Sequence, residues 1–70
     1  MISPEEVAAL AELYDRFANA FERTSADRLQ ARRQFYARIE MLYEQEGRGV
    51  SYEGFRFEMV KLCKAFLRKN

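Results

Sequence analysis

Arginines gather in one short stretch of the chain, residues 27–38, which reads DRLQARRQFYAR. A guanidinium group carries planar N–H donors that match a carboxylate or a phosphate, so these arginines could bind an acidic partner. A further arginine at position 56 stands among aromatic residues that could add apolar contact area. The candidate partner-binding residues are Arg28, Arg32, Arg33, Arg56, Phe57, Tyr36 and Tyr52.

Catalytic and metal-binding chemistry has little support in the composition. The chain has no His and one Cys, and it lacks a glycine-rich phosphate loop and an HExxH motif. Cys63 cannot form an internal disulfide or a zinc site of the usual composition, and its apolar neighbours should keep the thiol inert. Glu40, Glu44 and Glu46 lie on one predicted helix, which rarely supplies enough oxygens to enclose a hard cation. We therefore expect no enzyme, cofactor, metal or small-molecule substrate.

The first of three predicted helices spans residues 4–22. Ser3 can cap its first backbone N–H groups, Pro4 suits the first helical position, and Glu6 can complete a capping box. Apolar side chains then recur at steps of three and four residues, which is typical of an amphipathic helix. This apolar stripe consists of Val7, Leu10, Tyr14, Phe17 and Phe21.

The second predicted helix spans residues 25–46. Thr24 or Ser25 can cap its first turn, and Gly47 can end it at low steric cost. One broad face of this helix is apolar, although Arg32 falls near the centre of that face. The apolar residues of the face are Leu29, Phe35, Tyr36, Ile39, Leu42 and Tyr43.

The third predicted helix spans residues 52–68, with Ser51 as its cap. Its expected buried residues are Phe55, Met59, Leu62, Cys63 and Phe66. An alternative is a short irregular strand at residues 50–59, but Gly54 interrupts its alternation and no second strand is available for pairing. Short connections favour antiparallel neighbours, so the expected fold is an all-α, small antiparallel three-helix bundle in a single domain, residues 1–70.

Charge alternates in four blocks along the chain, although the net charge is only +1. Residues 1–22 and 40–58 are acidic, whereas residues 23–39 and 59–70 are basic. In an antiparallel bundle the start of the second helix lies beside the end of the third, so the basic blocks would meet in one basic pole and the acidic blocks in another. The basic pole adds, as candidate anion contacts, Arg23, Arg38, Lys61, Lys64, Arg68 and Lys69.

The charges of the second helix oppose its own macrodipole. Arginines occupy its first half and glutamates its last turns, which costs up to about 1 kcal/mol per misplaced exposed charge. Two interpretations remain open. The arginines are solvated side chains offset by acids such as Asp15 and Glu22, with the stems of Arg32 and Arg56 lying over the core. Alternatively, the arginines form a surface for an acidic partner.

Size and aromatic content favour association with a partner. A chain of 70 residues is near the size at which oligomerisation supplements a small core, and ten Phe and Tyr side chains are hard to bury within three helices. Phe57 and Met41 fall on faces that should be exposed to solvent. We therefore expect a non-catalytic protein-interaction or regulatory module, acting as a homodimer or as a small subunit. The alternative is nucleic-acid binding without sequence preference, through phosphate contacts of the basic pole.

The ends and apolar runs of the chain give an expected location. The N-terminal MISPEEVAAL lacks the basic start of a signal peptide, and no apolar run is long enough to cross a bilayer. No predicted helix has a clean cationic face opposite a bulky apolar one, so we expect no membrane association. A single cysteine fits a reducing compartment, and we expect a cytoplasmic protein.

Overall fold

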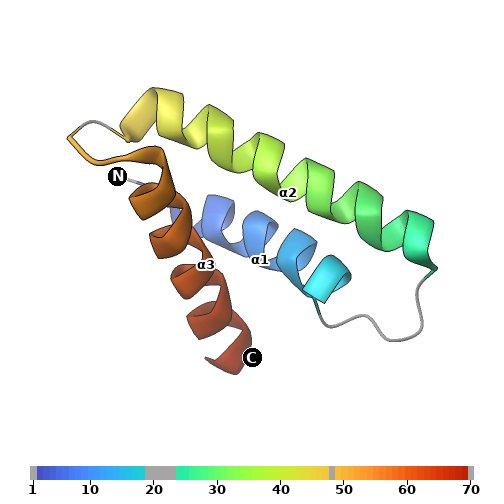
Figure 1. The fold of residues 1–70 in the computed structure, drawn as a ribbon. Coiled ribbons are helices and arrows are strands. Elements are labelled where there is room, and N and C mark those ends of the chain that lie inside the picture. Colours follow the sequence, from blue (N-terminus) through green and yellow to red (C-terminus); the bar gives the residue numbers. More distant parts are fainter. Residues whose placement is uncertain (1, 19–23, 48, 70) are drawn as a thin grey trace.

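A computed structural model of the chain contains three helices (Figure 1). It describes residues 2–18, 24–47 and 49–69. The helices are α1 (Pro4–Ala18), α2 (Ser25–Glu46) and α3 (Tyr52–Lys69), and the described residues contain no strand. The prediction of a small all-α three-helix bundle is confirmed. The predicted bounds of α2 are also confirmed, α3 ends one residue later than predicted, and the predicted part of the first helix at 19–22 lies outside the described residues.

The N-terminal end of each helix is capped by a hydroxyl side chain. The Glu6 N–H donates to Ser3 Oγ over 3.2 Å, the Asp27 N–H donates to Thr24 Oγ1 over 3.1 Å, and the Gly54 N–H donates to Ser51 Oγ over 3.1 Å. The capping box predicted for α1 is only half formed, because among the described residues no hydrogen bond returns from the Glu6 carboxylate, whose Oε2 is buried without a partner.

The connection between α2 and α3 is held by Tyr43. Its backbone carbonyl accepts the Gly47 N–H over 2.8 Å, and its hydroxyl donates to the Val50 carbonyl oxygen over 2.8 Å. A Cβ atom at position 47 would overlap the Tyr43 ring, so only glycine fits there. Gly49 follows with φ at 85°, in the left-handed region that glycine favours. These contacts fix the path by which the chain enters α3.

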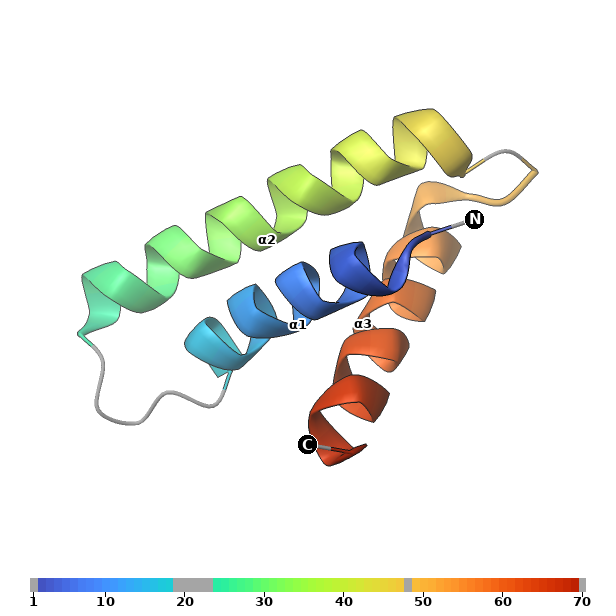
Figure 2. The same cartoon turned by 180° about the vertical axis from the view of Figure 1, so that it is seen from behind.

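α1 lies between the other two helices and makes most of the interhelical contacts. α2 runs antiparallel alongside α1, whereas α3 crosses α1 obliquely (Figures 1 and 2). α2 and α3 contact each other little, and they diverge from the connection that joins them. The start of α2 and the end of α3 consequently lie apart in both views. The predicted adjacency of these two helix ends is wrong, because α3 packs mainly on α1 and does not align with α2.

The core is formed by buried residues from all three helices. They are Leu10 and Ala11 of α1, Phe35, Ile39 and Leu42 of α2, and Phe55, Met59 and Cys63 of α3. Leu62, which was predicted to be buried, is 42% exposed, and Leu29, which was predicted to lie on the apolar face of α2, is 46% exposed. The reason is the divergence of α3, which leaves the first turns of α2 uncovered and restricts its own buried stripe to the residues that face α1. Phe66 is partly buried.

The exposed apolar residues include two that the sequence placed on solvent-facing sides. Phe57 is 63% exposed and Met41 is 56% exposed, so both predictions are confirmed. Within the described residues, none of the three helices is both long enough and apolar enough to span a bilayer.

Candidate functional site

Two arginines from different helices lie against the same aromatic ring. The guanidinium carbons of Arg32 (α2) and Arg56 (α3) lie 5.5 Å and 5.4 Å from the centre of the Tyr36 ring. Arg56 also lies 5.6 Å from the ring centre of Tyr52. These distances suit cation–π attraction, which contributes about 0.5–1 kcal/mol at exposed sites. We call Arg32, Tyr36, Arg56 and Tyr52 the arginine–tyrosine cluster.

The core holds the tyrosines of this cluster in place. The ring centre of Tyr36 lies 5.2 Å from that of Phe35, which is fully buried, and 6.2 Å from that of Phe17 in α1. Tyr52 packs edge-on against Tyr43 at 5.4 Å. Because both tyrosines are half-buried and packed on one side, they provide fixed platforms for the two exposed arginines.

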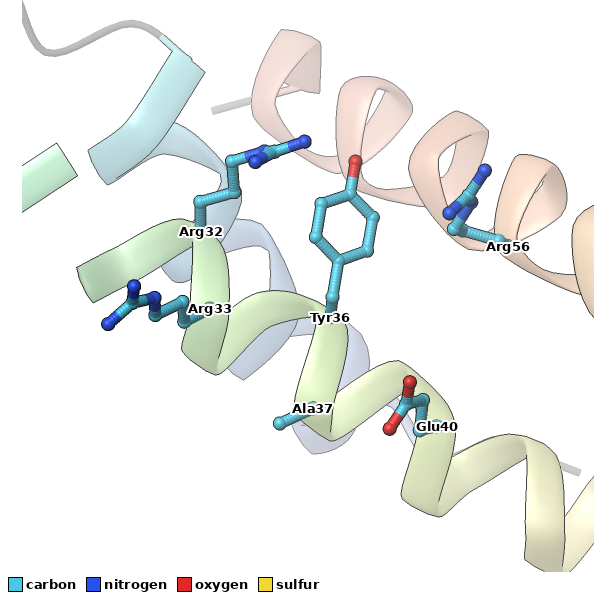
Figure 3. Close-up of a pocket in the computed structure, with 6 residues that line it drawn as sticks. All are labelled: Arg32, Arg33, Tyr36, Ala37, Glu40 and Arg56. Carbon is cyan, nitrogen blue, oxygen red and sulfur yellow. The ribbon is translucent and has the colours of Figure 1, made fainter. Parts of the chain in front are cut away.

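A surface hollow of about 430 Å³ adjoins this cluster (Figure 3). Its lining residues are Arg32, Arg33, Tyr36, Ala37, Glu40 and Arg56. Figure 3 shows the Tyr36 hydroxyl between the guanidinium groups of Arg32 and Arg56, whereas Arg33 extends away from the ring. Two guanidinium groups and one hydroxyl are all hydrogen-bond donors, so an oxyanion could bind where they converge.

The arginines of the candidate site form no ion pair with any described residue. No carboxylate of the described residues lies within ion-pair distance of Arg28, Arg32, Arg33 or Arg56. Since Arg32 and Arg56 share one ring, their guanidinium carbons are at most about 11 Å apart, close enough for like charges to repel. Asp15 thus forms no ion pair with these four arginines, and Glu22 lies outside the described residues.

A second hollow, of about 370 Å³, lies between α1 and α3. Its lining residues are Tyr14, Lys64, Leu67 and Arg68. Phe17 connects the two hollows, since its ring centre lies 5.3 Å from that of Tyr14 and 6.2 Å from that of Tyr36. The aromatic side chains of α1 thus extend from one cationic hollow to the other.

The remaining predicted site residues lie elsewhere. Phe57 follows Arg56 by one residue, a rotation of about 100° around α3, and it faces Lys61, whose ammonium lies 5.6 Å from its ring centre. Lys61 also forms an exposed ion pair with Glu58 at 3.6 Å. Arg28, Arg38 and Lys69 are exposed at other positions, and Arg23 lies outside the described residues. The basic residues therefore do not form one continuous pole, because α2 and α3 diverge.

Four residues of the two hollows were not recognised in the sequence as parts of a site. Glu40 was assigned to the acidic pole, Tyr14 was assigned to the apolar stripe of the first helix, and Ala37 and Leu67 were given no role. The spacing of residues in α3 could have indicated that the two hollows share one side of this helix. Arg56, Val60, Lys64 and Leu67 recur there at steps of four, four and three residues.

The chemistry available at these hollows is anion binding. Among the described residues no group of three His, Cys, Asp or Glu side chains is placed to hold a metal ion. Burial raises the pKa of the Cys63 thiol to about 11 from an ordinary value of 9.0, so little reactive thiolate exists near neutral pH. No protein-family model, curated protein or solved structure matches this chain. Its function must therefore be inferred from its own residues.

Proposed function

We propose that this chain is a small, non-catalytic protein-interaction or regulatory module whose arginine–tyrosine cluster binds carboxylate groups of a protein partner. The observation that carries this proposal is that Arg32 and Arg56 lie over the ring of Tyr36 with no carboxylate of the described residues within ion-pair distance of either. Arginines that are held in place and lack a counter-charge are suited to bind one on a partner.

The partner in this proposal is a second copy of the chain or another protein to which the chain is a small subunit. Exposed Phe57 and Met41 favour association of either kind, since burial of apolar area would add to the stability of a small core. Sedimentation velocity over a range of protein concentrations separates the two forms. We place the function in the cytoplasm, where reducing conditions suit a chain with one cysteine.

A second candidate function is binding of a nucleic-acid backbone without sequence preference. The observation that favours it is the alternation of Tyr36, Arg56 and Tyr52, because unpaired bases stack on aromatic rings and guanidinium planes. One observation weighs against it. The two basic segments lie apart, so they form no continuous track for a phosphate backbone.

The test compares two anionic probes at low and moderate salt. Fluorescence anisotropy would measure binding of labelled poly-L-glutamate and of a mixed-sequence single-stranded oligonucleotide to the wild-type chain. The Arg32→Gln/Arg56→Gln variant should bind poly-L-glutamate roughly 10-fold more weakly, because both planar charges of the cluster are removed. Its affinity should also depend less steeply on salt.

The matched control is Arg38→Gln/Lys61→Gln, which removes two exposed positive charges away from the cluster. This control should change binding of poly-L-glutamate less than about 2-fold. Equal losses in both variants would mean that only total charge matters, and the proposed site would be wrong. Tighter binding of the oligonucleotide than of poly-L-glutamate at the same salt would favour the second candidate function.

A further inference from the structure

The two hollows lie along one side of α3, and their linings are connected by the ring of Phe17, which contacts Tyr36 of the first and Tyr14 of the second. Arg56 lines the first hollow, Lys64 and Leu67 line the second, and the spacing of these residues puts them on the same side of the helix. At 1.5 Å per residue, Arg56 and Lys64 are about 12 Å apart along α3. We call the two hollows together the interhelical groove, since α2 lines the first, α1 lines the second and α3 lines both.

The floor of the interhelical groove is apolar. Phe17 is half-buried and contacts the rings of Tyr14 and Tyr36, which line the second and the first hollow. Leu67 of α3 is half-buried as well and lines the second hollow. A depression lined by partly exposed rings and an aliphatic side chain offers apolar area that a ligand can cover.

Both rims of the groove are cationic. α2 contributes Arg32, and α3 contributes Arg56, Lys64 and Arg68. None of these four cations has a carboxylate of the described residues within ion-pair distance. Glu40 is the one acid among the residues that line the two hollows, and it lies toward the α2–α3 connection. The charge that complements these rims is therefore negative along most of the groove.

The described surfaces of the chain itself do not supply a matching occupant. Such a surface needs carboxylates together with several large apolar side chains. The exposed acids of α1, Glu5, Glu12 and Asp15, have no exposed large apolar residue beside them, since none of the large exposed hydrophobics belongs to α1. α2 offers Met41 alone near its exposed glutamates. Exposed Val50, Phe57 and Leu62 lie near Glu53 and Glu58 in the sequence, but Arg56 and Lys61 of the same segment balance these two acids, so this surface carries no net negative charge. A second copy therefore fits the groove poorly.

We infer that the interhelical groove is a docking site for an acidic, amphipathic α-helix of another protein, an inference that rests on the proposed function. The apolar face of the partner helix covers Tyr14, Phe17 and Leu67. Its carboxylates pair with Arg32 on one rim and with Lys64 and Arg68 on the other. A helix of about 15 residues, about 22 Å long, spans the groove, which is the helix-in-groove mode of recognition.

The experiment uses two labelled synthetic peptides of about 15 residues and equal composition, the length of the expected occupant. One carries Leu at positions i, i+3, i+4 and i+7 with Glu on the opposite side, and the other has the same residues permuted so that no apolar face forms. Fluorescence anisotropy would give affinities, and circular dichroism would report helix formation on binding. The amphipathic peptide should bind at least roughly 10-fold more tightly and gain helix content.

The variants locate the bound peptide. Lys64→Gln/Arg68→Gln should weaken binding of the amphipathic peptide roughly 5-fold, whereas Arg38→Gln/Lys61→Gln should change it less than about 2-fold. Equal affinity for the two peptides, together with no effect of Lys64→Gln/Arg68→Gln, would overturn the inference. The proposed function would stand in that case if Arg32→Gln/Arg56→Gln still weakened binding of poly-L-glutamate, and both would fail if neither peptide nor poly-L-glutamate bound.

One further outcome would assign the groove to another occupant. If the chain is a dimer, the backbone amide NMR signals of Tyr14, Phe17 and Leu67 can be followed on dilution. Concentration-dependent shifts confined to these residues would show that a second copy fills the groove, and the inference of a different protein would be wrong. A monomer, or a dimer whose groove signals do not change on dilution while the amphipathic peptide binds, supports the inference.

Discussion

Replacement of Arg32 by Gln should leave the stability of the fold nearly unchanged. The guanidinium carbon of Arg32 is at most about 11 Å from that of Arg56. At that separation two like charges repel by about 0.4 kcal/mol in water-like surroundings. The repulsion rises to about 1.5 kcal/mol at an effective dielectric constant of about 20. The substitution relieves this repulsion but loses a cation–π contact worth about 0.5–1 kcal/mol. The two effects oppose each other, so the net change in the free energy of unfolding should stay within about 1 kcal/mol.

Urea unfolding followed by circular dichroism measures this change, with Arg38→Gln as the matched control on the same helix. Arg and Gln have similar helix propensities, so the comparison reports the environment of each arginine. Because the repulsion is screened by ions, any gain in stability on replacing Arg32 should shrink as salt is added. A loss more than about 2 kcal/mol larger than that of the control would refute the reasoning, since losses of that size come from broken structural interactions.

Three further predictions concern the exposed aromatic residue, the buried thiol and a helix cap. Phe57→Ser should shift any self-associated form toward monomer in sedimentation velocity with little loss of helix content, and a large loss of helicity would contradict the exposure of Phe57. Cys63 should resist thiol reagents until the chain is unfolded in denaturant, because burial raises its pKa to about 11. Since the thiol ionises at lower pH in the unfolded chain, the free energy of unfolding should fall as pH rises from 9.0 toward 11, and a Cys63→Ala variant should lack this part of the fall. Thr24→Ala removes the oxygen that accepts the Asp27 N–H and should lower the free energy of unfolding by about 1 kcal/mol in urea titrations, whereas unchanged stability would mean that this cap contributes nothing.

The sequence was sufficient to predict the helices and most of the buried residues. Ser3, Thr24 and Ser51 are capping residues whose local chemistry does not depend on the rest of the fold, and each caps a helix as predicted. Gly47 ends α2 because no Cβ fits beside Tyr43, which is also a short-range effect. Predictions that depend on contacts close in sequence were therefore reliable.

The angle between the helices was not predictable in the same way. It depends on how the buried stripes of α1 and α3 fit together, and short connections alone were taken to imply aligned neighbours. As a result, Leu62 was assigned to the core, Leu29 was counted with the apolar face of α2, and two basic segments were joined into one pole. Arg32 and Arg56 were recognised from residue type, but their meeting at Tyr36 could not be predicted, because it depends on the place where α3 passes α2.

The connection between α2 and α3 sets the direction of α3, and it therefore affects the width of the interhelical groove some distance away. α3 contains 18 residues and is therefore about 27 Å long, anchored at one end by the hydrogen bond from the Tyr43 hydroxyl to Val50. A rotation of about 5° at the connection would move the far end of a 27 Å helix by about 2 Å. Such a rotation would change the distance between Arg32 and Lys64, and the buried contacts of α3 with the core oppose it. Substitutions around Gly47 and Tyr43 could change which partner fits while every residue of the groove stays the same.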